Sequence, residues 1–248
     1  MLWYKAWRES RVRFFISAAA IAGMCLARVL FERRFYPGVA HEAPGVHNYI
    51  QYLFWTVFGG GVRGMMQLTS LLLGLGGLQR DRKQNTLGFT LALPVSRPRL
   101  VLTRAIVGFL QILSVSFLPP VILWAASPLV HQQLPLSYGL PFIPLWIIGG
   151  LVTFAFSFLC SVLFTSEYVA LAVAYMVYMF YLASTRHPRL AAYPLHIADF
   201  MSGRLGGMID PHTLLWTGNF SATMLAGFFA AALVMLSIAT FITTHQDL

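Results

Sequence analysis

Long apolar stretches, separated by short polar connections, constrain this chain more than any other feature. Six of them follow one another, at 14–31, 62–78, 102–124, 140–164, 168–184 and 221–242. Each is close to the roughly 20 residues that a helix needs to cross a bilayer. We therefore predict an all-α membrane protein with six transmembrane helices, in a single transmembrane domain over 1–248.

Composition supports this class and excludes others. Apolar residues make up 58% of the chain and charged residues only 10%, whereas soluble domains carry about 25% charged residues. This excludes a disordered chain, a nucleic-acid-binding domain and an ordinary cytosolic enzyme. The net charge of +9 is then explained by basic flanks that orient the spans and contact membrane lipid, with no nucleic acid as partner. Cys25 and Cys160 lie within apolar runs, where cysteines are typically packing residues.

The distribution of basic residues predicts the orientation. Ten of the 17 lysines and arginines lie before residue 14 or from residue 79 to residue 104. Cytoplasmic segments of membrane proteins carry the excess of basic residues. We therefore expect the amino terminus and the connection 79–101 on the cytoplasmic side of the cell (plasma or inner) membrane. Six spans would return the carboxyl terminus to the same side.

Residues 1–13 have the pattern of an amphipathic helix. At 3.6 residues per turn Trp3, Trp7 and Phe14 fall on one stripe, and cations such as Arg8 and Arg11 spread over the rest. Indoles at head-group depth, with cations toward phosphate, are typical of an interfacial helix. We predict that 1–13 lies in the membrane interface with these five residues as anchors. The alternative is a first span that simply begins with a basic flank.

Glycines complicate the second apolar stretch. The run 49–58 is also apolar, but Gly59, Gly60 and Gly61 interrupt it, and a break there makes 49–58 an interfacial or re-entrant segment. Arg63 follows at membrane depth, where a cation either faces a wet cavity or snorkels to the surface. Arg63 is therefore a candidate for lining a transport pathway, and an anchor at the outer interface is the alternative.

Two further features concern a helix end and a loop. Pro119-Pro120, late in the third stretch, predicts a kink or a break. The connection 185–220 is predicted to be an outer loop of short interfacial helices. Its histidines and aspartates match no known ligand spacing, so we predict no metal site.

The connection 79–99 changes character along its length. It begins with the charged run 80–83, continues with the apolar residues Leu87 and Phe89, and ends its apolar part at Pro94. A short helix that exposes Leu and Phe at the cytoplasmic surface is suited to a groove on a soluble partner. A basic loop that only obeys the positive-inside rule is the alternative.

The same segment carries a family resemblance. The run Asp81-Arg-Lys-Gln-Asn-Thr86, followed by Leu91-Ala-Leu-Pro-Val-Ser-Arg97, resembles the signature of the permeases of type-2 ABC transporters. Asp81 stands where that family usually has Glu, and Asn85 where it usually has Gly. The Trp-rich amino terminus, the six expected spans and the short carboxyl terminus are also similar to that family.

The resemblance implies a transport subunit, more often an exporter than an importer. Two such chains, as a homodimer or a heterodimer, would form the substrate pathway, and 79–99 would be a coupling helix that docks on a separate cytoplasmic ABC ATPase. The positions that match the family are Asp81, Thr86, Pro94 and Arg97. The coupling residues that we add from charge and exposure are Arg80, Arg82, Lys83, Leu87 and Phe89.

The chain offers no nucleotide site of its own. A P-loop needs a glycine-rich turn followed by Lys and Ser or Thr, and neither Lys5 nor Lys83 follows such a turn. We expect ATP and Mg²⁺ on the partner ATPase, no cofactor on this chain and no catalytic residues. The predicted spans contain no carboxylate, which disfavours an intramembrane enzyme and a secondary carrier. The alternatives are a secondary carrier and a scaffold subunit that transports nothing.

Overall fold

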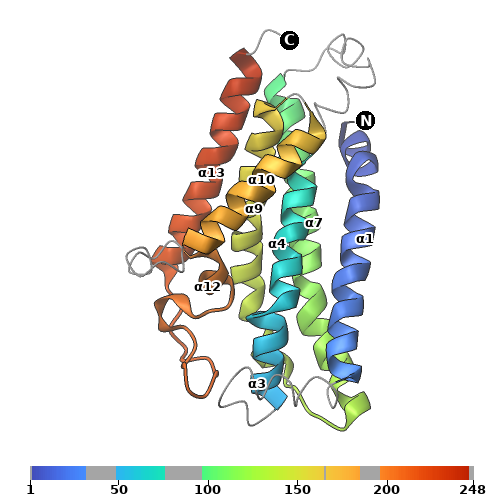
Figure 1. Cartoon of the computed structure of the whole chain (residues 1–248), viewed down its shortest axis with the longest axis vertical. Helices are drawn as coiled ribbons and strands as arrows, with labels where there is room; N and C mark the ends of the chain where they lie inside the picture. Colours follow the sequence, from blue (N-terminus) through green and yellow to red (C-terminus); the bar gives the residue numbers. More distant parts are fainter. Residues whose placement is uncertain (1, 32–48, 76–96, 165, 185–195, 246–248) are drawn as a thin grey trace.

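The computed structural model describes residues 2–31, 49–75, 97–164, 166–184 and 196–245, without the side chains of Arg97, Pro98 and Glu167. Within these ranges the regular secondary structure is helical, apart from an isolated β-bridge between Ile209 and Trp216. The long helices run along the long axis of the molecule, and α10 (Glu167–Ser184) crosses them obliquely (Figure 1). The all-α fold predicted from the apolar stretches is therefore observed.

Four helices are long and apolar enough to cross a membrane. They are α1 (Leu2–Leu30), α7 (Arg97–Ala126), α9 (Phe142–Leu163) and α13 (Ala222–His245). Two short helices lie in the connection between α7 and α9: η2 (Ser127–Val130) follows α7, and α8 (Leu136–Gly139) precedes α9.

Six such helices, as predicted from the sequence, are not present in the described part of the chain. Within the stretch 62–78, α4 (Gly61–Gly74) has 14 residues and is about 21 Å long, against a hydrocarbon core of about 30 Å. It ends there because the backbone of Leu75 is extended. The apolar part of α10 is likewise shorter than the four long helices.

α9 lies at the centre of the bundle because it is apolar all round. In its span 78% of the residues are buried, against 22% for α1 and 17% for α13, which lie at the periphery. α4, α7, α10, α13 and α12 (Ile197–Met201) all pack on α9, and α1 packs on α7 and α4. This arrangement can be followed in Figure 1.

Small residues let α4 and α9 approach closely. A Cβ atom on Gly74 would lie 2.6 Å from the carbonyl oxygen of Phe154. Across the same interface Ser157 Oγ donates a hydrogen bond to the Leu71 carbonyl at 2.7 Å. Close backbone contact and interhelical hydrogen bonds are the main sources of helix association in lipid. They hold α4 on α9 although α4 is short.

The helix that precedes α4 breaks at the glycine run. α3 (Tyr49–Leu53) continues into the π-helix η1 (Phe54–Phe58), and Gly59 and Gly60 separate this unit from α4. A Cβ atom on Gly60 would lie 2.1 Å from the Trp55 carbonyl oxygen, so only glycine fits this bend. The unit packs into the core, where Phe58 stacks on Phe142 with ring centroids 3.9 Å apart.

α7 corrects the expectation of a break at its prolines. The helix continues through Pro119 and Pro120 to Ala126, although the prolines remove two donors from its hydrogen-bond ladder. α8 packs closely on this part of α7, because a Cβ atom on Gly139 would lie 2.9 Å from Pro120 Cβ. Tertiary packing therefore holds the last turns in helical form.

The segment 196–217 packs into the core, and its predicted place at the membrane interface stays a prediction. The side chains of Phe200, Met201 and Met208 are fully buried. Trp146 of α9 donates its Nε1–H to the Met201 carbonyl at 3.0 Å. Apolar residues in this connection therefore insert between the helices, so the segment closes one end of the bundle.

Several helix ends lie together at the opposite end of the bundle, among them those next to the two chain termini. The start of α1, the end of α4, the start of α7 and the end of α13 lie together there, and α9 is followed by α10 at the same end (Figure 1). We call this the terminal end of the bundle.

Candidate functional site

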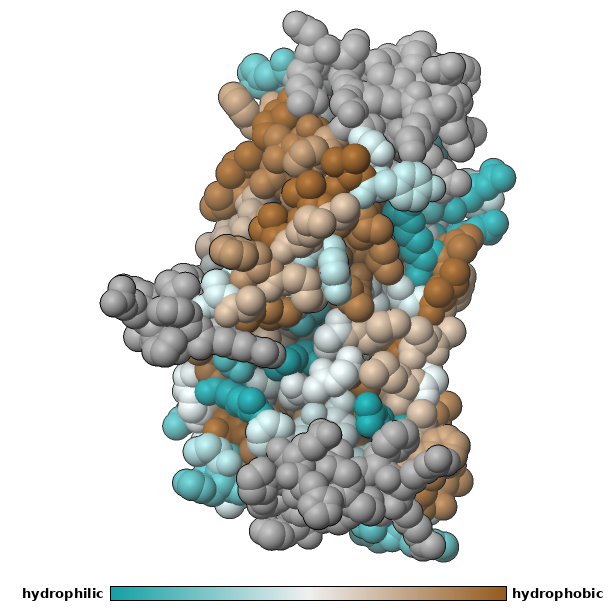
Figure 2. Space-filling model, viewed as in Figure 1, coloured by the Kyte–Doolittle hydropathy of each residue, from teal (hydrophilic) through white to brown (hydrophobic). Residues whose placement is uncertain are grey.

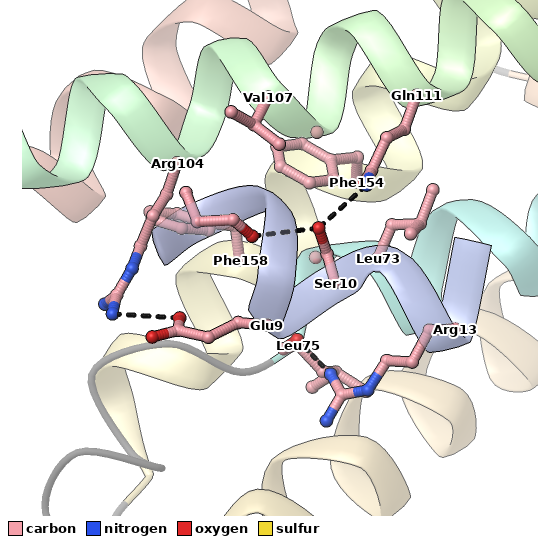
Figure 3. Close-up of a pocket in the computed structure, with 13 residues that line it drawn as sticks. Glu9, Ser10, Arg13, Leu73, Leu75, Arg104, Val107, Gln111, Phe154 and Phe158 are labelled. Atoms are coloured by element: carbon pink, nitrogen blue, oxygen red, sulfur yellow. Dashed lines mark hydrogen bonds and ion pairs between the residues drawn. The ribbon is translucent and has the colours of Figure 1, made fainter. Parts of the chain in front are cut away.

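A polar cluster lies between α1 and α7 near the terminal end, within otherwise apolar helices (Figure 3). Arg104 Nη2 forms an ion pair with Glu9 Oε2 at 3.2 Å, and Gln111 Nε2 donates to Ser10 Oγ at 2.7 Å. The side chain of Arg104 is 9% exposed and Gln111 is 2% exposed, so water screens these contacts little. We call these four residues, together with Arg13, the α1–α7 cluster.

Arg13 connects α1 to the end of α4. Its Nη1 donates to the Leu75 carbonyl and makes a longer contact of 3.4 Å with the Leu72 carbonyl. The last carbonyls of a helix have no partner within the helix, and a cation there also interacts favourably with the helix dipole. Leu75 directly precedes the segment 76–96, and Arg104 lies near the start of α7 that follows it. α1 therefore contacts both flanks of this segment.

A small cavity of about 40 Å³ lies beside the cluster, and its apolar wall includes Phe154 and Phe158 (Figure 3). A water molecule needs about 10–15 Å³ on this measure. The cavity therefore has room for a few water molecules. The contacts of the cluster connect α1 to α7 and α4.

The same contacts hold the amino-terminal half of α1 against the bundle. α1 is one continuous helix, with no break between residues 2–13 and the stretch that starts at 14. Glu9 and Ser10 bond to α7, and Arg13 bonds to α4. The place of 1–13 in the membrane interface stays a prediction.

The five predicted membrane anchors lie on this half of α1. Trp3, Trp7, Arg8 and Arg11 are exposed, and Phe14 packs partly against the core. The rings of Trp7 and Phe14 are in contact, with centroids 5.5 Å apart. The indoles and cations are therefore accessible from outside the bundle, and their role as anchors stays a prediction.

The predicted coupling residues lie almost entirely outside the described residues. Arg97 begins α7, but its side chain is not described. The others belong to 76–96 and are Arg80, Asp81, Arg82, Lys83, Thr86, Leu87, Phe89 and Pro94. Their role stays a prediction.

Arg63 lies near the start of α4, away from the terminal end. Its Nη1 donates to the Ala198 carbonyl of α12 at 2.7 Å. Nearby, the Arg204 guanidinium lies over the Trp55 ring at 4.3 Å from its centroid. Arg63 thus links α4 to α12, and its proposed place on a transport pathway stays a prediction.

Two charged groups of the segment 196–217 have altered pKa values. Burial lowers the pKa of the Arg204 guanidinium, and the nearby Asp199 carboxylate acts in the opposite direction. The pKa of Asp210 is lowered because the His212 backbone N–H, at 3.0 Å, and the Thr213 hydroxyl, at 2.8 Å, donate to its carboxylate. Within the described ranges, no group of three or more His, Cys, Asp or Glu side chains is placed to hold a metal ion.

Sequence reasoning did not predict the α1–α7 cluster, although two signals were present. Glu9 is the one acidic residue of α1, and Gln111 is the one glutamine of α7. A charge or an amide on an apolar helix needs a partner because an unpaired polar group is costly there. The sequence does not tell which helix supplies that partner.

Known proteins provide no further guide to the role of these residues. No protein-family model matches the sequence, and no curated protein is similar to it at a significant level. The functional assignment rests on the helical bundle, its polar contacts and the segment 76–96.

Proposed function

We propose that this chain is the transmembrane subunit of an ATP-driven exporter similar to the type-2 ABC transporters. In this proposal six segments cross the cell membrane, since α4 and α10 join the four long helices, and both chain ends are cytoplasmic. Two copies, or one copy and a related chain, form the substrate pathway. A separate cytoplasmic ATPase docks on 79–99 and binds ATP and Mg²⁺.

The observation that carries the proposal is the contact of α1 with both flanks of 76–96. Arg13 bonds to the Leu75 carbonyl on one flank, and Glu9 pairs with Arg104 on the other. A displacement of 76–96 would act directly on α4 and α7 and would reach α1 through these two contacts. Three helices would then move together, as energetic coupling through packed and hydrogen-bonded elements requires.

The length of 76–96 supports a docking role. The segment has 21 residues and joins α4 to α7, two helices that pack on each other. Connections between neighbouring helices of a bundle need about 2–8 residues, and much longer ones are usually functional. The additional residues are enough to form a docking element. The resemblance of 81–97 favours an ATPase as the partner.

The arrangement of the helix ends supports the proposed orientation. The start of α1, with its indoles and arginines, lies at the same end as the two flanks of 76–96 and the end of α13 (Figure 1). The proposal requires this grouping, because all of these features must face the cytoplasm. A bundle with the end of α13 at the opposite side would have contradicted it.

The first experiment tests coupling to an ATPase. We expect an ABC ATPase to co-purify with the tagged chain from its own membranes in a mild detergent. Phe89→Asp and Pro94→Leu should each lower transport-coupled ATP hydrolysis about tenfold or more, since a loss of about 1.4 kcal/mol at the dock reduces its occupancy tenfold. ATP hydrolysis and transport are measured together in proteoliposomes.

Matched controls are available in the connection 32–48, which the proposal places on the other side of the membrane. Phe35→Asp and Pro37→Leu make the same chemical changes there and should leave coupling intact. Equal losses in the control and test variants, or unchanged coupling in both test variants, contradict the docking assignment.

The second experiment tests sidedness. Cys25 and Cys160 are buried, so a membrane-impermeant maleimide should label an introduced cysteine with little background. In intact cells Thr86→Cys should stay unlabelled, and Phe35→Cys should be labelled. The reverse pattern excludes a cytoplasmic ATPase at 79–99. Transport that follows an ion gradient, without a co-purified ATPase, would identify a secondary carrier instead.

A further inference from the structure

Three buried donors lack acceptors where α4 meets α10. They are Arg63 Nε, Gln67 Nε2 and the Tyr178 hydroxyl, all shielded from solvent and without a hydrogen-bond partner. Gln67 and Tyr178 are 2% and 6% exposed. Native proteins pair nearly all buried polar groups, so each exception needs an explanation. Gln111 Oε1 of the α1–α7 cluster is another such exception, but these three belong to two helices that pack on each other, which indicates a common cause.

The three groups face one another. Arg63 and Gln67 are four residues apart on α4 and lie one turn apart on the same face. Leu71, one turn further, packs with Tyr178 of α10, and Tyr178 is also within electrostatic range of Arg63. Gln67 lies between Arg63 and Leu71 on this face of α4. We call Arg63, Gln67 and Tyr178 the α4–α10 slot.

The charges around the slot favour an anion. Arg63 and Arg204 are within electrostatic range of each other, and the Asp199 carboxylate is the acidic group that acts on both. Asp199 is already 3.4 Å from His196 Nδ1 and does not reach the three donors. Two arginines against one paired carboxylate leave a surplus of positive charge.

We propose that the α4–α10 slot binds one phosphate group, with Arg63, Gln67 and Tyr178 donating hydrogen bonds to its oxygens. An anionic oxygen accepts several hydrogen bonds at once, and an arginine N–H is well matched to phosphate. A ligand of this kind satisfies all three donors, which a single apolar group cannot. The proposal rests on these contacts alone and does not depend on the transport function.

Two sources of phosphate have the same chemistry, a free phosphate ion and the head group of a membrane lipid. Hydrophobic residues cover this face of the molecule over α10, and hydrophilic residues interrupt them at the level of α12 (Figure 2). Arg63 bonds to α12, so the slot is at the level where apolar surface gives way to polar surface. Both a soluble ion and a lipid head group are found at that depth of a membrane.

The test measures the unfolding temperature of the purified chain in an uncharged detergent at pH 7. One arm adds sodium phosphate, with a bulky sulfonate buffer salt at the same ionic strength as its control. The other adds phosphatidylglycerol, with a digalactosyl lipid of the same acyl chains as its control. We expect a saturable rise in Tm of about 3–6 °C at ten times the Kd in at least one arm.

Two conservative variants remove single donors and keep the packing, Tyr178→Phe and Gln67→Met. Each should abolish most of the rise in Tm. Tyr138→Phe is the matched control: its hydroxyl donates to the Leu214 carbonyl at 3.1 Å, outside the slot, so it should keep the full rise. A rise with phosphate identifies a free ion as ligand, and a rise with phosphatidylglycerol alone identifies a lipid head group.

No specific rise in either arm, or an undiminished rise in both slot variants, overturns the proposal. If the slot variants fail to fold, native mass spectrometry of the unaltered chain decides. One saturable phosphate or phosphatidylglycerol adduct per chain supports the proposal, and adducts that never saturate overturn it.

Discussion

The α1–α7 cluster and the α4–α10 slot use similar residues in opposite ways. In the cluster, the Arg104 guanidinium has a carboxylate partner and the Gln111 Nε2 donor has a hydroxyl partner, while Gln111 Oε1 is buried without one. In the slot, Arg63 bonds to the Ala198 carbonyl through Nη1, and the donors Arg63 Nε, Gln67 Nε2 and the Tyr178 hydroxyl have no partner. The cluster lies near the terminal end beside 76–96, and the slot lies near the segment that closes the other end.

This difference separates polar groups that hold a structure together from polar groups that are prepared for a ligand. A buried donor with a partner adds a modest net stability, whereas a buried donor without one carries its desolvation penalty. Removing a member of the cluster should therefore destabilise the fold. Removing the Tyr178 hydroxyl or the Gln67 amide donor of the slot should not, as long as no ligand is bound, whereas Arg63 also holds α12 through its Nη1.

The largest expected effect comes from breaking the ion pair of the cluster. Arg104→Met leaves the Glu9 carboxylate half-buried without this partner and should lower the free energy of unfolding by about 2–3 kcal/mol. Arg11→Met removes an exposed cation from the same helix as Glu9 and should change it by less than about 0.5 kcal/mol. Unfolding in mixed micelles measures both.

A double variant sharpens this result. Glu9→Gln combined with Arg104→Met removes both charges and should recover at least half of the loss, because the carboxylate that lost Arg104 is no longer charged. Lys5, which also pairs with Glu9 at 3.9 Å, is exposed enough for water to solvate it. If the double variant is as unstable as the sum of the single ones, the pair does not couple α1 to α7.

A smaller effect distinguishes the slot from an ordinary buried tyrosine. Without phosphate or phosphatidylglycerol, Tyr178→Phe removes a hydroxyl that has no partner and should change the free energy of unfolding by less than about 0.5 kcal/mol. Tyr138→Phe removes the hydrogen bond to Leu214 and should cost about 1 kcal/mol. Equal losses in the two variants would remove the contrast between cluster and slot.

The smallest effect is a local pH dependence in the segment 196–217. Because the pKa of Asp210 is lowered in the folded chain, its stabilising effect is present above the ordinary aspartate pKa and disappears as the pH falls through the lowered value. Protection of the His212 amide from hydrogen exchange, corrected for the intrinsic rate, should hold from pH 7 to about pH 4 and fall below it. Asp210→Asn, which cannot ionise, should show no such step.

The helical class was predictable because apolar runs report burial and length directly. The stretches 102–124, 140–164 and 221–242 correspond to α7, α9 and α13, and the bend at Gly60 was visible as a glycine run. The stretch 62–78 was overestimated because hydropathy does not register the extended backbone at Leu75. Pro119 and Pro120 do not end α7, because packing against α8 outweighs their low helix propensity.

The two polar sites were not predictable because their members are far apart in the sequence. Glu9 and Arg104 are 95 residues apart, and hydrophobic periodicity does not specify which helices become neighbours. Arg63 was noticed for its depth, but Tyr178 looked like one more aromatic residue of an apolar helix. Only the packing of α10 on α4 brings Tyr178 to Arg63 and Gln67.

The length of α1 has a consequence for how the protein sits in a bilayer. Its 29 residues form a rod of about 43 Å, which exceeds a hydrocarbon thickness of about 30 Å by roughly two and a half helical turns. Because α1 is bonded to its neighbours at Glu9 and Arg13, it has little freedom to tilt on its own. In a bilayer, one end of this rigid helix would then extend beyond the hydrocarbon core. A fluorophore attached at residue 2 would therefore move with the bundle, and its orientation would report the tilt of the bundle.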